Sequence, residues 1–136
     1  MTAADEQGII RLRSAYSVTE TLDRLEASLK QRAVLVFARI DFSGDAVRAG
    51  LSLRPEQLLI FGNPKGGTPL MAAQPGVGLD LPLKALAWED HDGQAWIAYN
   101  DPLYIVQRHG VAAALAANLA AVTPLIEHAA QKENGT

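Results

Sequence analysis

The sequence predicts an α+β two-layer sandwich, in which helices cover one face of a sheet. Three observations lead to this prediction. An amphipathic segment follows Ser17, a β-branched and aromatic run spans residues 34–41, and two alternating segments flank an Asp92-Gly93 turn. Because strands and helices are mixed along the chain and the one tight hairpin comes late, we expect a roughly five-stranded mixed sheet with two main helices and short connecting helices.

The first elements are a strand and a long helix. Residues 9–16 alternate as a strand does. Ser17 and Glu20 form a capping box, in which the hydroxyl and the carboxylate each accept a hydrogen bond from a free backbone amide. Apolar side chains then recur at helical spacing, which gives one stripe: Val18, Leu22, Leu25 and Leu29. We expect residues 34–41 to form a buried strand.

Short elements follow in the middle of the chain. We expect a helix at 45–51 that ends near Gly50, since glycine readily adopts the left-handed conformation of a C-terminal cap. Residues 57–61 are apolar and predict a short strand. Residues 81–89 and 94–99 predict the two strands of the hairpin.

Glycine and proline are concentrated between the third strand and the hairpin. Residues 62–78 hold five glycines and three prolines around a helix predicted at 68–74. Thr68 is its expected N-cap, and Pro69 its first residue, where the missing N–H costs nothing.

The C-terminal part predicts helices. Residues 101–108 begin with Asp-Pro and predict a short helix. Residues 111–130 carry an apolar stripe that continues through Pro124, so we expect one kinked helix; the stripe is Leu115, Leu119, Val122, Ile126 and Ala129.

Composition excludes several classes of function. The chain has 136 residues, a formal net charge of −3 and no cysteine. We therefore expect one domain with its core at about 9–130 and a flexible tail at 131–136. The lack of cysteine excludes thiol and iron–sulfur chemistry, and no ligand spacing predicts a metal site or a cofactor. With no basic run and no leader-like N-terminus, we expect a cytoplasmic, soluble protein that binds neither nucleic acid nor membrane.

The loop at 62–67 is one candidate site. It leads into a predicted helix N-terminus, where free amides and Lys65 suit a phosphate or a carboxylate. Asn63 either points its amide at a ligand or closes an Asx turn. The alternative is a tight turn whose glycines supply positive φ and nothing more.

Two titratable residues are candidates for acid–base chemistry. His109 has an ordinary pKa near the working range and precedes Gly110 at a junction between helices. Asp80 lies between two leucines, where burial would perturb a carboxylate. The alternatives are a histidine that caps helix carbonyls and a carboxylate that braces its own loop.

Seven segments occur in an order that closely resembles one family. They are ARID (38–41), AGLSLRP (49–55), FGNPKGGTPLM (61–71), GLDLPLKAL (78–86), WED (88–90), YNDP (99–102) and RHG (108–110). Together they resemble the domain-of-unknown-function family numbered 302, over about residues 16–129. The resemblance implies a small α+β fold of bacterial type, a homodimer and no assigned activity. Members often carry an Asp-His pair where this chain has Asp41-Phe42.

These observations lead to one functional hypothesis and two alternatives. We expect a homodimer that binds a small molecule or an anion in a pocket between the 62–80 loop and the 99–109 segment. Asn63, Lys65, Tyr99 and Tyr104 would bind the ligand beside Asp80 and His109, over walls from Phe61 and Leu79. One alternative is a small enzyme with His109 as acid or base and Asp80 as its partner. The other is an interaction module that acts through its dimer surface.

Overall fold

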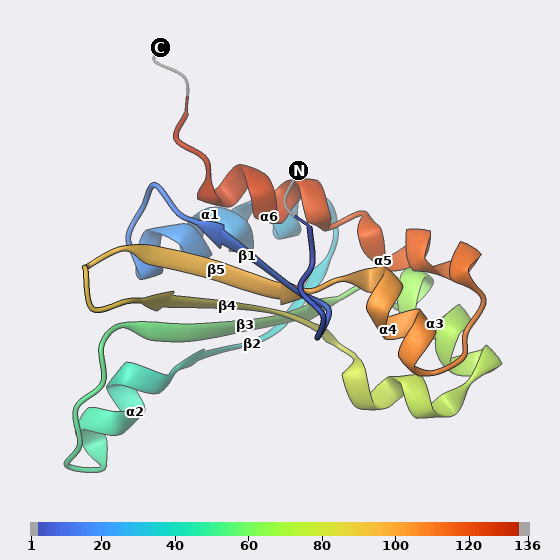
Figure 1. Cartoon of the computed structure of the whole chain (residues 1–136), viewed down its shortest axis with the longest axis horizontal. Coiled ribbons are helices and arrows are strands. Elements are labelled where there is room, and N and C mark those ends of the chain that lie inside the picture. Colours follow the sequence, from blue (N-terminus) through green and yellow to red (C-terminus); the bar gives the residue numbers. More distant parts are fainter. Residues whose placement is uncertain (1–2, 134–136) are drawn as a thin grey trace.

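The computed structural model describes residues 3–133 and contains one five-stranded sheet, with strand order β1-β5-β4-β3-β2 (Figure 1). The strands are β1 (Ile9–Arg13), β2 (Leu35–Asp41), β3 (Glu56–Gly62), β4 (Leu83–Glu89) and β5 (Ala95–Asn100). The α+β class is confirmed. All four strand pairings are antiparallel, however, so the prediction of a mixed sheet is wrong. The 62–83 connection contains helices, yet it starts and ends at the same end of the sheet, so it reverses the chain as a hairpin does.

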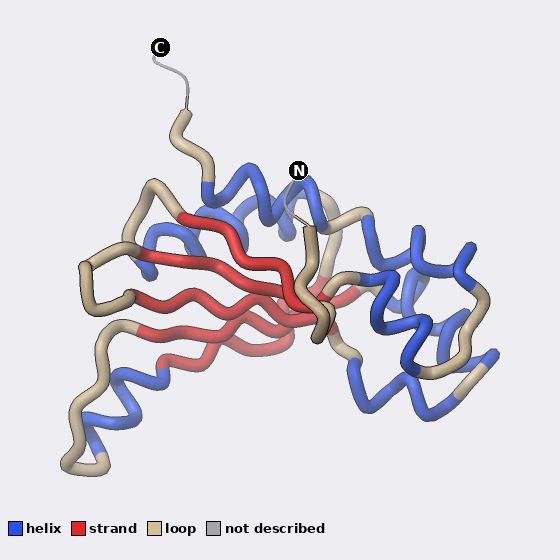
Figure 2. Tube along the Cα trace, in the orientation of Figure 1, coloured by secondary structure: helices blue, strands red, loops and turns tan. Residues whose placement is uncertain are grey.

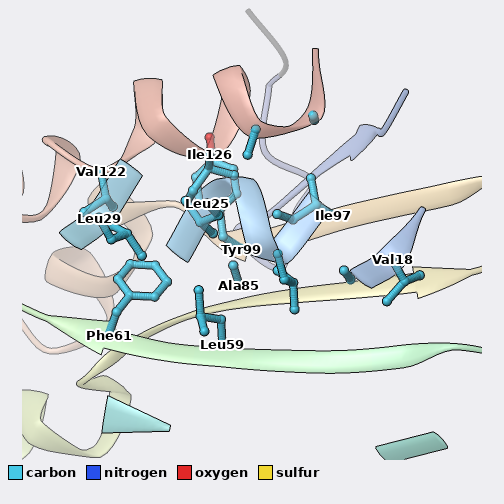
Figure 3. Packing of buried hydrophobic residues seen from close by; sticks show 14 of the residues in the cluster. Val18, Leu25, Leu29, Leu59, Phe61, Ala85, Ile97, Tyr99, Val122 and Ile126 are labelled. Carbon is cyan, nitrogen blue, oxygen red and sulfur yellow. The ribbon is translucent and has the colours of Figure 1, made fainter. Parts of the chain in front are cut away.

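The long helix α1 (Val18–Gln31) begins directly after Ser17, which forms the N-cap half of the predicted capping box. Ser17 Oγ accepts a hydrogen bond from the backbone N–H of Glu20 at 3.1 Å. The predicted stripe is fully buried, and α1 packs across β2, β3, β4 and β5. Figure 3 shows the resulting core, in which Leu25 and Leu29 of the helix lie over Leu59, Phe61 and other side chains of the sheet.

A second group of helices gathers at one end of the sheet (Figure 2). It contains α3 (Pro64–Ala73), the 3₁₀ helix η1 (Pro75–Asp80), α4 (Pro102–Arg108), η2 (Ala113–Ala116) and α5 (Ala117–Ala120). These elements enclose their own apolar cluster, which consists of Leu70, Val77, Ile105, Val106, Val111 and Leu119. The fold therefore has two cores. At the opposite end, α2 (Phe42–Arg48) extends from the sheet.

The C-terminal segment is broken where a single kinked helix was expected. The helical stretch Ala113–Ala120 and α6 (Thr123–Ala130) meet at an angle of 43°. Pro124 lies in the first turn of α6, where backbone N–H groups have no partner within the helix, so the N–H that proline lacks costs no hydrogen bond. No single helix among residues 3–133 is long and apolar enough to cross a membrane, and only this bent pair meets that test of length and composition when its two parts are joined.

Strand β2 is an edge strand, which corrects the prediction that 34–41 is buried. Leu35 and Phe37 are 50% and 54% exposed. The register against β3 shifts between Val36 and Ala38, so Phe37 is the extra residue of a bulge. Of the predicted tail, residues 134–136 lie outside the described part, and Glu133 donates its backbone N–H to the Tyr16 hydroxyl at 3.2 Å.

Candidate functional site

A cavity of about 310 Å³ lies where the two cores meet. Val34 and Val122 on its wall belong to the larger core, and Leu81 and Leu119 to the smaller one. We call this space the α3–α5 cavity. Its lining is mostly apolar, with three polar side chains; the lining residues are Val34, Phe37, Gly62, Asn63, Pro64, Gly66, Gly67, Thr68, Met71, Leu81, Pro82, Leu83, Asn118, Leu119, Ala121 and Val122.

The start of α3 shapes one wall of this cavity. Asn63 is the N-cap: its Oδ1 accepts a hydrogen bond from the backbone N–H of Lys65 at 3.0 Å, and Pro64 is the first helical residue. The helix thus begins four residues before the predicted start at Thr68. Gly66 lets α3 approach α5 closely, since a Cβ there would lie 2.7 Å from the carbonyl oxygen of Asn118.

The predicted ligand-binding residues do not share this cavity. Of the four, Asn63 lines it, whereas the exposed Lys65 does not. Tyr99 is 7% exposed and belongs to the main core, where burial raises the pKa of its hydroxyl above the ordinary value. Tyr104 packs against the Cα of Gly8 in the N-terminal segment. These residues therefore do not lie together around the α3–α5 cavity, and strand alternation directs Tyr99 into the core, beside Ile97.

The two predicted walls are also misplaced. Phe61 is fully buried in the main core, and Leu79 is 74% exposed. The residues that line the cavity instead come mostly from three separate stretches: 62–71, 81–83 and 118–122. Of these stretches, only the Gly-rich loop was predicted as a candidate site.

Asp80 and His109 do lie together, as the acid–base hypothesis requires. Asp80 ends η1 and His109 caps the C-terminus of α4, and their Oδ2 and Nε2 atoms are 2.5 Å apart. One guanidinium nitrogen of Arg108 donates to both carboxylate oxygens of Asp80 at 3.0 Å. The side chains of Asp80 and His109 are 19% and 13% exposed. This cluster could relay a proton, and it also ties η1 to α4.

The Asp41-Phe42 pair, in which Phe42 departs from the family pattern, lies at the start of α2. Asp41 is the N-cap of α2: it accepts hydrogen bonds from the Ser43 hydroxyl at 2.6 Å and from the Gly44 amide at 3.0 Å. The Ser43 bond is the main reason why the pKa of Asp41 is lowered. Within residues 3–133, no three His, Asp or Glu side chains are grouped closely enough to hold a metal ion.

Both the sequence and the fold match known proteins. A family model described as "Domain of unknown function DUF302" matches residues 10–129. The chain belongs to the DUF302 family. An uncharacterized conserved DUF302 protein from Bacillus stearothermophilus has the same fold, with a TM-score of 0.74 and 22% sequence identity over 90% of this chain and 95% of that one.

Longer proteins also contain a DUF302-like stretch. A Brucella suis protein named fluoride-specific ion channel FluC 1 is 44% identical over 111 residues, which cover 82% of this chain and 44% of that protein. A Brucella abortus protein of the same name is 44% identical over 111 residues, which cover 82% of this chain and 41% of that protein. The chain therefore spans about two-fifths of the length of the curated relatives that it matches.

Proposed function

We propose that this DUF302 chain is a homodimeric domain that binds a small, neutral, largely apolar molecule in the α3–α5 cavity. The observation that carries the proposal is the size and lining of the cavity. At about 310 Å³ it falls at the lower end of the range of ligand pockets. An engineered apolar cavity of about 150 Å³ holds benzene, so this one suits a molecule of roughly twice that volume.

The lining favours a neutral ligand over the anion that the Gly-rich loop suggested. None of the lining residues carries a charge, and Lys65 is outside the lining. Asn63, Thr68 and Asn118 supply the polar groups that would orient a carbonyl, amide or hydroxyl of the ligand. A carboxylate or phosphate would find no cation here to offset its loss of hydration.

The comparisons support a binding module rather than a free-standing catalyst. In the two Brucella relatives, a stretch like this chain accounts for 44% and 41% of a longer protein. A domain that is joined to further sequence can transmit the binding of a small molecule to the rest of its protein. The channel name belongs to each of those longer proteins as a whole, and the shared stretch is less than half of it.

A substitution at the cavity mouth tests the ligand-binding proposal. Ala121 is exposed and lines the cavity, so Ala121→Phe would fill space there without disturbing either core. We expect the neutral fluorescent dye N-phenyl-1-naphthylamine to bind the unaltered chain with a 1:1 stoichiometry, and the dissociation constant to rise at least about tenfold in Ala121→Phe.

The matched control is Ala117→Phe, an exposed position on α5 that does not line the cavity. It should bind the dye as the unaltered chain does. Equal binding by both variants, or no saturable binding by any of the three proteins, would overturn the proposal.

The acid–base alternative has one observation in its favour, the 2.5 Å contact between His109 and Asp80. It predicts that the chain hydrolyses an activated ester such as p-nitrophenyl acetate faster than free imidazole does. His109→Gln and Asp80→Asn should each lower that rate by roughly 10²-fold, while circular dichroism shows them folded. Rates that are unchanged in both variants would leave the cluster with only its structural role.

A further inference from the structure

The second face of the sheet is apolar and, within residues 3–133, carries no helical layer like that of α1. On the central strands, Leu59, Phe61, Ala85, Ala87 and Ile97 face α1 and are fully buried. The alternate positions therefore face away from α1, and we call this surface the open face. In a two-layer sandwich those positions are normally polar. Here most of them are apolar: Leu58, Ile60, Leu86, Trp88, Trp96 and Ala98. The polar residues at such positions are Glu56, Lys84 and Asn100.

One cross-strand row on the open face has opposite charges at its two ends. The strand registers align Glu56 with Trp88, Trp88 with Trp96, and Trp96 with Arg13. The two indole rings are nearly parallel, at 12°, with centroids 6.3 Å apart. The Arg13 guanidinium lies over Trp96, 5.3 Å from the ring centroid. The row therefore runs from an acidic residue through two aromatic ones to a basic residue.

Such a row is complementary to its own reverse. Glu56 lies on β3, the two tryptophans on β4 and β5, and Arg13 on β1, so the row is centred between β4 and β5. A two-fold axis that runs along the strands at this centre would set Glu56 opposite the second copy's Arg13. It would also set Trp88 opposite the second copy's Trp96. A closed symmetric contact uses the same patch twice, and this row matches its own reverse in charge.

We propose that a second copy of this chain covers the open face, sheet against sheet, around a two-fold axis between β4 and β5. The inference rests on the homodimer of the proposed function and adds which surface forms it. Packing the two sheets face to face buries the apolar side chains of both copies in a layer about 10 Å thick. The Glu56–Arg13 pairs at its two sides fix the register. They also exclude a two-fold axis along the row itself, which would set Glu56 opposite the second copy's Glu56 and Arg13 opposite its Arg13.

Charge reversal tests this surface directly. We expect the dissociation constant of the dimer, measured by sedimentation on the full chain, to rise about tenfold or more in Glu56→Arg and in Arg13→Glu. The double variant should return to within about threefold of the unaltered chain, because both pairs are restored with their signs exchanged. Arg32→Glu, on the exposed C-terminal end of α1, is the control and should leave the dimer unchanged.

Tryptophan fluorescence gives an independent readout. The chain has two tryptophans, and both lie in this row. Dilution of the protein to concentrations below the dissociation constant should therefore shift the emission to longer wavelength, because Trp88 and Trp96 become exposed to water when the dimer dissociates.

The outcomes separate the two levels of the proposal. A chain that stays monomeric at all concentrations overturns the homodimer itself. A dimer that tolerates both single reversals overturns the open-face interface alone, and places the contact elsewhere. Dye binding in the α3–α5 cavity is measured separately and decides the ligand, whichever of these results is found.

Discussion

Asn63 has two roles that can be separated by substitution. It caps α3 through the Lys65 amide, and it lines the α3–α5 cavity. We expect Asn63→Ala to lower the free energy of unfolding by about 1 kcal/mol, measured with urea, because the amide of Lys65 loses its partner. Asn63→Asp keeps the cap, so its stability should remain within a few tenths of a kcal/mol of the unaltered chain.

The same pair of variants also reports on the cavity. Asn63→Asp places a carboxylate at the exposed edge of an uncharged, mostly apolar lining, and should weaken binding of the neutral dye although the fold is intact. If Asn63→Ala is as stable as the unaltered chain, the cap contributes nothing. If Asn63→Asp binds the dye normally, Asn63 is not an anchor.

At the same scale, the sequence located some site residues and not others. Asp80 and His109 were paired on chemistry alone, and the structure does bring them within 2.5 Å. Asn118 and Ala121 carried no signal, because they lie in an alanine-rich helical run whose pattern says nothing about which residues border a cavity. Such positions depend on the packing of α5 against α3, a contact between segments about fifty residues apart.

Element types were largely predictable from local pattern, whereas several element boundaries were not, among them the start of α2 at Phe42 and the start of α3 at Pro64. Asn63-Pro64 and Thr68-Pro69 both offer a capping residue followed by proline, so local chemistry cannot choose between them. The earlier start places Gly66 against α5 and buries Leu70 in the smaller core. The choice is therefore made by tertiary packing.

The break before α6 has a similar cause. Leu119 packs into the smaller core and Ile126 into the larger one, which lie in different places. One straight helix could not place side chains in both cores, and the chain bends by 43° between the two helical segments. The apolar stripe alone is continuous, so it predicts a single helix.

The position of β2 at the sheet edge depends on strand order, which a run of apolar residues does not encode. Its core-facing side is held by Arg39, which donates to the Asp23 carboxylate at 2.6 Å and to the Thr19 carbonyl at 3.1 Å, both on α1. That contact anchors the strand to the helix layer. Its exposed Phe37 lines the α3–α5 cavity, whereas the exposed Leu35 does not.

Across the whole molecule, several carboxylates are held by specific donors, which links the stability of the fold to pH. Their pKa values lie below the ordinary ones, and in each case the largest cause is a hydrogen bond from a neighbouring side chain: Asp5 from Arg11, Glu26 from Lys30, Asp41 from Ser43, Asp90 from Trp96 and Glu133 from Arg24. Four of these pairs are local in sequence, whereas Arg24–Glu133 connects α1 with the segment after α6.

Acid should therefore destabilise the fold as a whole. A carboxylate whose pKa is lower in the folded than in the unfolded chain adds stability above the unfolded value, and that stability is lost as the pH falls through the folded value. We expect the melting temperature to stay level from pH 7 to about 5 and to fall below about 4, near the ordinary pKa values of these groups.

Glu26→Gln, which removes one such group, should lower the melting temperature at neutral pH and make the fall of the melting temperature with acid shallower. Glu6→Gln, an exposed position with no described salt bridge, is the control. A melting temperature that is level down to pH 3 would contradict the role assigned to these pairs.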